Sequence, residues 1–397
     1  MKHSGQTIAA APDICWGMVD DDLLLFDPHD RRLHVLNSTA AMVWALTDNS
    51  IQVGTIVQRL SAEFRMVPQQ IADDVESVVE NLIASGLCID TDRPPSPTLR
   101  PPRVPRLQSA PATPGPSTIG PFTALGATIL IDVPDPLLAT ELARVLAPLG
   151  DTHLDVAAGR GVLSYRVEMT AHGFDLFVNG RTLARRMSRA VCLRTLLSDC
   201  NASPLDFVDD AIVLHAAAAR IGDDLMVFPG VSNAGKSTLV TQLVQRGHGY
   251  LTDEAVAFDI DTLDAEPYHK SICIDPGAHP LFPELQPAAT TASDETWDVD
   301  PRSVGPGRLT GGGAISGLVF PIFRPNAEAS LRPIDPIETM HRLLRNSFDF
   351  EALGQPGFAA MIRLANLTPA WELAHGGDGH LELVESAAGG SEVLSLR

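Results

Sequence analysis

The chain has 397 residues, of which 45% are hydrophobic and 20% are charged, so it has the composition of a globular protein with room for two or three cores. Its net charge of −20 argues against binding nucleic acid through a basic surface. Apolar runs stay below the length of about 18 residues that a membrane span needs, and the scattered cysteines fit a reducing compartment. We therefore expect a cytoplasmic protein without a nucleic-acid or membrane partner.

The first block, residues 14–90, has the pattern of a small domain of strands followed by helices. LLLFD (Leu23–Asp27) and RLHVLN (Arg32–Asn37) are predicted strands around the turn DPHD. Three helices are expected from caps and apolar spacing: one after a cap at Asn37 or Ser38, one near Ile51–Phe64 and one near Pro68–Ser85. Together these elements predict a winged-helix-like fold.

A proline-rich segment follows this block. Ten prolines lie between Pro94 and Pro121, and proline at that density favours extended, semi-rigid chain. The sequence thus predicts four parts: an N-terminal domain (1–92), a linker (93–121), a small α+β subdomain (122–208) and a C-terminal α/β domain (209–397).

The subdomain after the linker mixes strands and helices. ATILIDV is a predicted strand, Pro136–Leu149 a predicted helix, and LSYRVEM and FDLFVNGRTL form a hairpin-like pair that turns on Asn179–Gly180. From Ile212 onward we expect strands to alternate with helices, as in an α/β nucleotide-binding core.

The segment Gly230–Ser237, GVSNAGKS, fits the phosphate-binding pattern GxxxxGK[ST]. The apolar segment LMVFP precedes it and an amphipathic helix ending at Gly247 follows it, which is the context that this loop requires. Lys236 would reach the β- and γ-phosphates, and the Ser237 hydroxyl would hold Mg²⁺. The residues expected to bind ATP are Gly230, Ser232, Asn233, Ala234, Gly235, Lys236, Ser237 and Thr238.

Two adjacent carboxylates, Asp253 and Glu254, follow that helix and the short strand GYLT, which returns the chain to the loop. One carboxylate can ligate Mg²⁺ while the other accepts a proton from an attacking hydroxyl. A single acid that holds the metal through water, as in an ATPase, fits the same spacing. The spacing alone does not decide between these roles.

RGHGYLTDEAV after a phosphate loop resembles the HPr kinase family of bacterial serine kinases, and His215 in VLHAAAARIGDD matches a histidine of that family. The resemblance implies that Asp253 deprotonates the acceptor hydroxyl, that Glu254 is a metal-side carboxylate, and that His215 neighbours the active site; a structural role for His215 stays open. It also implies a homo-oligomer. The chain departs from the family in having Asp–Glu instead of two aspartates, and it has no clear copy of the later Glu-Arg-Gly signature. Further phosphate or lid contacts at Lys270 and Arg308 stay open.

The first block resembles the PqqD-like domain, a leader-peptide-binding module of ribosomal peptide biosynthesis. LLLFD, RLHVLNSTAAMVWALTD and NLIASGLC carry the resemblance in order and spacing. It implies that a leader peptide adds as a strand to Arg32–Leu36 and lies against the helix around Asp74–Leu82. The candidate peptide-binding residues are Arg32, His34, Val35, Val75 and Val78. A winged helix that only packs on its neighbour, or one that binds DNA, is the alternative; the few positive charges argue against DNA.

Taken together, these features predict an ATP- and Mg²⁺-dependent kinase that phosphorylates a hydroxyl, by expectation of serine, on a precursor peptide held through its leader. Tethering by the linker would raise the local acceptor concentration to roughly millimolar. Two alternatives stay open: a nucleotide-gated peptide-binding adaptor without phosphotransfer, and a kinase of a small hydroxylated metabolite.

Overall fold

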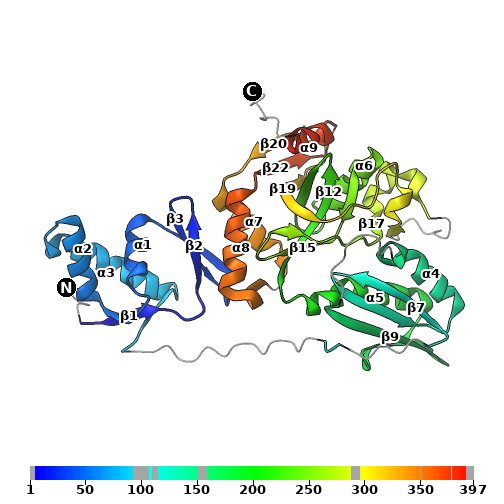
Figure 1. Ribbon diagram of the computed structural model, residues 1–397, viewed down its shortest axis with the longest axis horizontal. Helices are drawn as coiled ribbons and strands as arrows, with labels where there is room; N and C mark the ends of the chain where they lie inside the picture. Colours follow the sequence, from blue (N-terminus) through cyan, green and yellow to red (C-terminus); the bar gives the residue numbers. More distant parts are fainter. Residues whose placement is uncertain are drawn as a thin grey trace. The chain divides into compact units, whose positions relative to one another are not determined.

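The computed structural model describes residues 5–92, 107–109, 115–150, 159–287, 296–348, 350–376 and 378–389 (Figure 1). The chain forms two compact units. The first unit combines Met1–Val104 with Glu351–Asn366, and the second unit combines Pro105–Phe350 with Leu367–Arg397. The predicted division at residues 92 and 209 did not anticipate that a late segment of the chain belongs to the first unit.

The first unit contains two small antiparallel sheets with strand orders β5-β1-β6 and β2-β3-β4. Its strands are β1 (Thr7–Ala10), β2 (Cys15–Val19), β3 (Asp22–Asp27), β4 (Arg32–Leu36), β5 (Ile51–Gln52) and β6 (Cys88–Asp90). Its helices are α1 (Ser38–Ala45), α2 (Val53–Phe64), α3 (Pro68–Ala84) and α8 (Gly354–Leu367, of which residues 354–366 belong to this unit). The expected strands and the helix at Pro68–Ser85 are confirmed, whereas β5 takes the first two residues of the helix predicted near Ile51.

Helix α8 covers the sheet β2-β3-β4 on the side away from α1. The Phe358 ring stacks on Phe26 with centroids 5.7 Å apart, and a Cβ atom on Gly17 would lie 2.4 Å from Ile362 Cδ1. The Gln355 side chain accepts a hydrogen bond from the Trp16 N–H (2.9 Å) and donates one to the Trp16 carbonyl oxygen (2.7 Å). Strand β2 is therefore covered by a helix that lies 339 positions later in the sequence.

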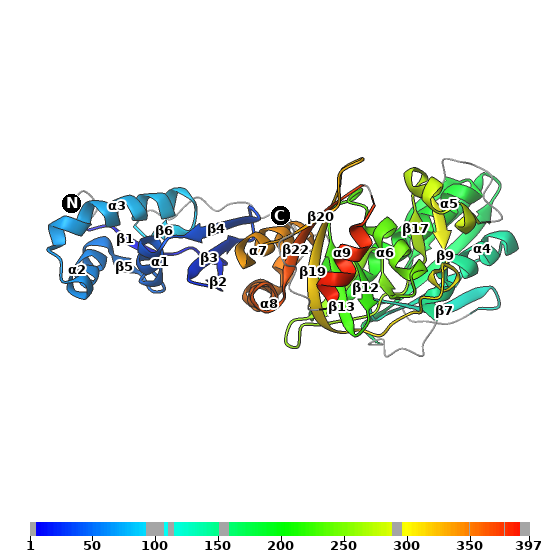
Figure 2. The same ribbon diagram turned by 90° about the horizontal axis from the view of Figure 1, so that it is seen from above.

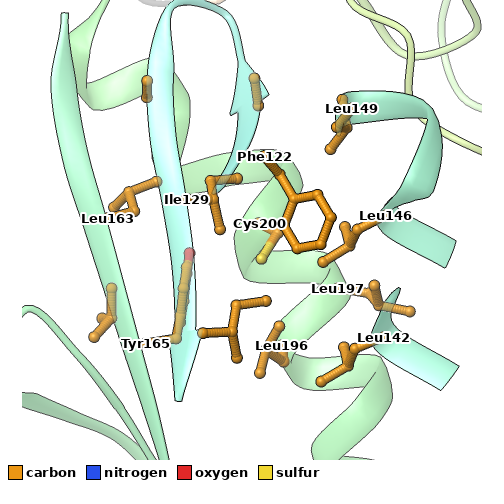
Figure 3. Close-up of a cluster of buried hydrophobic side chains, with 14 of the residues drawn as sticks. Phe122, Ile129, Leu142, Leu146, Leu149, Leu163, Tyr165, Leu196, Leu197 and Cys200 are labelled. Carbon is orange, nitrogen blue, oxygen red and sulfur yellow. The ribbon is translucent and has the colours of Figure 1, made fainter. Parts of the chain in front are cut away.

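The second unit begins with a five-stranded sheet of order β11-β10-β9-β8-β7, in which β8 and β9 are parallel and the other pairs antiparallel. Its elements are β7 (Thr118–Ala124), β8 (Ala127–Asp132), α4 (Pro136–Leu146), β9 (Gly161–Thr170), β10 (Gly173–Val178), β11 (Arg181–Met187) and α5 (Arg189–Ala202). Figure 3 shows leucines of α4 and α5 directed at Ile129 and Phe122 on the sheet. Asn179 and Gly180, both with positive φ, form a turn at the predicted residues, but this turn joins β10 to β11 and not β9 to β10.

The predicted linker overlaps this subdomain. Strand β7 begins at Thr118, within the segment predicted as linker. Leu107 donates its backbone N–H to Asp206, and the Gln108 carbonyl oxygen accepts a hydrogen bond from Asn179. Residues 93–106 and 110–114 of the predicted linker lie outside the described residues.

The rest of the second unit is built on a nine-stranded mixed sheet whose main order is β13-β12-β15-β16-β19-β22-β20. Strands β14 and β21 also pair with β12, and β13 pairs in parallel with β19. The strands are β12 (Ala211–Ile221), β13 (Asp224–Pro229), β14 (Gly249–Thr252), β15 (Ala255–Asp259), β16 (Asp264–Ala265), β19 (Gly313–Phe323), β20 (Ser330–Pro333), β21 (Ser347–Phe348) and β22 (Ala370–His375). The helices are α6 (Lys236–Gln245), α7 (Pro336–Arg345) and α9 (His380–Ala388), and β17 (Ile272–Ile274) and β18 (Trp297–Val299) form a separate pair.

This arrangement corrects the expected alternation of strand and helix after Ile212. Strands β14 to β20 follow one another without an intervening α-helix, and β12 pairs antiparallel with both β13 and β15. The fold is mixed α/β as predicted, and β13, β19 and β22 are parallel neighbours within the sheet. Along the described ranges, no helix is both long and apolar enough to cross a membrane.

Candidate nucleotide-binding site

The loop Gly230–Gly235 connects the buried strand β13 to the N-terminus of α6. Asn233 and Gly235 adopt left-handed backbone conformations, with φ of 65° and 88°, which turn the chain tightly before the helix. The Lys236 ammonium donates hydrogen bonds to the carbonyl oxygens of Gly230 (2.7 Å) and Val231 (3.0 Å). Burial lowers the pKa of Lys236, while the nearby charges of Glu254 and Asp253 oppose that shift.

A cavity of about 690 Å³ lies against this loop, entirely within the second unit. It brings the loop together with the acidic pair and the histidine predicted from the sequence. The predicted residues that line it are His215, Ser232, Asn233, Gly235, Lys236, Ser237, Thr238, Asp253 and Glu254. Gly230 and Ala234 do not line it; Gly230 instead holds the Lys236 ammonium.

Asp253 is almost fully buried, and both of its carboxylate oxygens have partners. Oδ1 accepts a hydrogen bond from Lys270 Nζ at 2.7 Å and lies 3.1 Å from the Tyr250 hydroxyl. Oδ2 accepts a hydrogen bond from the Cys273 N–H at 3.0 Å. The carboxylate is thus fixed in one orientation at the edge of the cavity.

Lys270 is the counter-ion of Asp253 and does not itself line the cavity. Burial disfavours the charged ammonium, but the attraction of Asp253 outweighs it, so the pKa of Lys270 lies well above its usual value. The ammonium also donates to the Ser271 carbonyl oxygen at 2.9 Å. A direct phosphate contact, which the sequence left open for Lys270, does not fit this placement, and Arg308 likewise lies outside the cavity lining.

Glu254 and His215 form the more accessible part of the acidic end. The Glu254 side chain is 40% exposed, and its Oε1 lies 3.9 Å from His215 Nε2. Burial and then the charge of Lys236 lower the pKa of His215 to about 4, so the ring is neutral at neutral pH. Cys273 also lines this end, but burial raises the pKa of its thiol to about 12, which keeps the sulfur protonated.

Sequence reasoning missed four further residues that line the cavity: Phe323, His375, Asp378 and His380. His375 Nε2 lies 3.0 Å from the Ala234 carbonyl oxygen, so the ring contacts the loop Gly230–Gly235. A Cβ atom on Gly235 would lie 2.5 Å from His375 Cε1, which leaves room only for glycine beside this ring. No local motif marks His375, since it is only the last residue of the strand AWELAH.

The oxygen-bearing side chains that line the cavity determine whether Mg²⁺ could bind there. Among the residues that the structure describes, no three His, Cys, Asp or Glu side chains are arranged to hold a metal ion by themselves. Phosphate-loop proteins need no such cluster, because phosphate oxygens and water complete the coordination around one hydroxyl and one carboxylate. Ser237 and Glu254 line the same cavity and supply those two groups, so the residues present fit the ion.

The peptide-binding residues predicted in the first unit divide into two groups. Arg32, His34 and Val35 lie on β4, the end strand of its sheet as far as the structure describes it, and Val35 is 41% exposed. Val75 is a correction: it is 1% exposed and belongs to the core under α3, so it cannot contact a peptide. Val78 is partly buried against the same core.

Comparisons with known proteins agree with part of this description. Residues 22–87 match the model of the family described as Coenzyme PQQ synthesis protein D (PqqD), so a PqqD domain lies at the N-terminus of the chain. No curated protein matches the sequence. Among solved structures, the chain is similar to the HPr(Ser) kinase/phosphatase from Coxiella burnetii, with 13% identity, 44% of this chain and 92% of that chain covered, and a TM-score of 0.24.

Proposed function

We propose that the protein is an ATP-dependent kinase that transfers the γ-phosphate to a hydroxyl, by expectation of serine, on a precursor peptide. One observation carries the proposal: a single cavity contains the phosphate loop with Lys236, the acidic pair Asp253–Glu254 and the neutral His215. A site that only bound nucleotide would not need two carboxylates and a neutral imidazole around the loop. These groups match the needs of phosphoryl transfer, which relies on positioning and charge stabilisation.

In the proposed reaction, the loop N–H groups and Lys236 neutralise the phosphate oxygens. The acceptor oxygen forms a bond to the γ-phosphorus, the bond to the departing ADP oxygen breaks, and the hydroxyl proton passes to Asp253. Lys270, Tyr250 and the Cys273 N–H hold the Asp253 carboxylate for that role. Ser237 and Glu254 would hold Mg²⁺, which offsets negative charge on the phosphates.

The PqqD domain supports a peptide as the acceptor. PqqD domains bind precursor peptides, and β4 offers a strand edge to which an extended peptide can add. The chain passes between the two units at residues 104/105, 350/351 and 366/367. The proline-rich linker is therefore not the sole tether between capture and transfer.

The test incubates wild type with γ-labelled ATP, Mg²⁺ and the small-peptide fraction of the native host. We expect a labelled peptide with wild type, and loss of label with Lys236→Ala and Asp253→Asn. Removing a general base slows transfer by about 10²- to 10⁴-fold while nucleotide binding persists. Asp264→Asn, an exposed carboxylate outside the cavity lining, is the matched control and should keep full transfer.

A second comparison distinguishes the roles of the two carboxylates, Asp253 and Glu254. With Asp253 as the base and Glu254 on the metal side, Glu254→Gln should raise the Mg²⁺ concentration needed for half-maximal rate, and Asp253→Asn should not. The reverse pattern assigns the proton to Glu254, which is the more exposed of the pair. Tight ATP binding with no labelled acceptor would favour the nucleotide-gated adaptor, and label on a small metabolite would favour the metabolite kinase.

Deleting residues 1–92 is a poor test of the peptide requirement. The deletion removes the sheet on which α8 packs and so leaves Phe358 and Ile362 without their partners. A substitution on the β4 edge is cleaner: Val35→Pro removes a backbone donor that strand addition needs. A peptide kinase should lose turnover of the full precursor and keep ATP binding, whereas a metabolite kinase should be unaffected.

A further inference from the structure

Three aromatic rings that line the cavity, those of Phe323, His375 and His380, have no part in the proposed phosphate transfer. Phe323 and His375 are register partners at the carboxyl ends of the parallel strands β19 and β22, and their rings meet edge to face at 5.6 Å. The His380 ring lies 5.5 Å from His375, at the start of α9. Phe323 is 52% exposed, so part of its ring is accessible from the cavity that it lines.

Hydrogen bonds hold two of these rings to the phosphate-binding elements. His375 Nε2 donates to the Ala234 carbonyl oxygen in the loop at 3.0 Å. His380 Nε2 donates to Gln242 Oε1, one turn beyond Thr238 on α6, at 2.8 Å. Burial lowers the pKa of His375, which keeps this ring neutral. His375 and His380 are therefore fixed to the loop and to α6, and belong to the same site.

Helix α6 lines the cavity from Lys236 to Gln242. Lys236, at the first residue of α6, has the acidic pair near it, because Asp253 and Glu254 act on its charge. Thr238 and Gln242 line the cavity further along the helix, and Gln242 reaches His380. Figure 2 shows α6 between α9 and the strand β17. A triphosphate whose γ end meets Lys236 and Asp253 therefore lies in the same cavity as the aromatic residues, which border both the loop and Gln242.

We propose that Phe323, His375 and His380 form a nucleobase subsite, in which the base of the bound nucleoside triphosphate stacks on the exposed Phe323 ring. Aromatic faces are tolerant, favourable partners for bases. Asp378, which lines the same cavity, offers a carboxylate acceptor to an exocyclic amino group such as that of adenine. This inference rests on the proposed nucleotide-dependent function and adds which residues take the base.

The test compares ATP with inorganic tripolyphosphate, which has the phosphates but no base. Binding of each to the full chain with Mg²⁺ is measured by calorimetry for wild type, Phe323→Ala, His380→Ala and Leu281→Ala. Leu281 is a large exposed side chain that also lines the cavity but is not aromatic, so it is the matched control. We expect Phe323→Ala to weaken ATP about tenfold, as loss of one base–aromatic stack does, and to leave tripolyphosphate unchanged.

The outcomes separate this inference from the function on which it rests. If wild type binds neither ligand, both the proposed nucleotide site and the nucleobase subsite are wrong. Wild type that binds both, with Phe323→Ala and His380→Ala each changing ATP affinity less than twofold or weakening both ligands equally, overturns the subsite alone. A selective loss of ATP affinity in Leu281→Ala with none in Phe323→Ala places the base beside Leu281 and also overturns the subsite. Melting temperatures confirm that each variant is folded.

Discussion

The two units are stabilised by contacts of different chemistry: an ion pair in the second unit and an aromatic contact in the first. In the second unit, a buried ion pair, Lys270–Asp253, closes the acidic end of the cavity. In the first unit, an apolar contact, Phe26–Phe358, closes the sheet against α8. A buried charge pair adds little net stability when intact but leaves a costly unpaired charge when broken. An apolar contact contributes in proportion to the surface it buries, so its loss scales with the atoms removed.

The largest stability effect should come from Lys270→Met. The substitution keeps an unbranched side chain of similar length but leaves Asp253 buried without its counter-ion, which costs about 3–5 kcal/mol. Urea unfolding of both proteins at pH 7 measures the difference. The double variant Lys270→Met/Asp253→Asn should recover much of the loss, because no charge is then left buried. A single-variant loss below about 1 kcal/mol would contradict the paired-charge account.

Phe358→Ala should cost a comparable or slightly smaller amount, about 3–4 kcal/mol, by opening a cavity between α8 and β3. The effect should be confined to the first unit, so hydrogen exchange in β2 and β3 should rise while that in β13 stays unchanged. Leu367→Ala, at the exposed end of the same helix, is the control and should change little. Equal protection of β2 and β3 in wild type and Phe358→Ala would show that α8 does not support this sheet.

The titration of His215 should contribute to the pH dependence of the free energy of unfolding. Its pKa falls from 6.5 to about 4 in the folded protein, so the unfolded chain binds more protons between these values. The free energy of unfolding therefore falls as the pH drops from 6.5 through 4, because burial disfavours the charged imidazolium. The unfolding free energy of wild type should therefore decrease relative to that of His215→Gln over that range as the pH falls. Parallel curves for the two proteins would show that His215 titrates normally.

What could be predicted from the sequence depends on how local the determining contacts are. The loop Gly230–Ser237 fixes its own conformation within a few residues, and Asp253 and Glu254 return to it after one helix and one strand. The PqqD domain was likewise visible from its order of short segments. The succession of strands without helices after α6 was not visible in the sequence. These strands pair with β12 and β19, and the paired strands lie far apart in the sequence.

The site residues that the sequence did not reveal also depend on contacts between distant parts of the chain. His375 and Phe323 become neighbours only through the parallel pairing of β19 with β22, and Lys270 meets Asp253 only when both are buried. Helix α8 belongs to the first unit although its sequence lies between the two segments of the second unit. The Val75 error has a different cause: apolar helical spacing predicts which face is buried, and the peptide-binding role assigned by resemblance conflicted with that spacing.

The smallest expected effect separates local from long-range support in the first unit. Asn37 Oδ1 accepts a hydrogen bond from the Ala40 N–H and caps α1, which resolves the choice between Asn37 and Ser38. Asn37→Ala should therefore cost about 1 kcal/mol in urea unfolding, and Ser38→Ala close to nothing. That loss is a fraction of the one expected for Phe358→Ala, since a cap satisfies one backbone donor whereas α8 covers the whole sheet. If Asn37→Ala instead matched Phe358→Ala, the first unit would depend on its own helices more than on the helix that the later chain supplies.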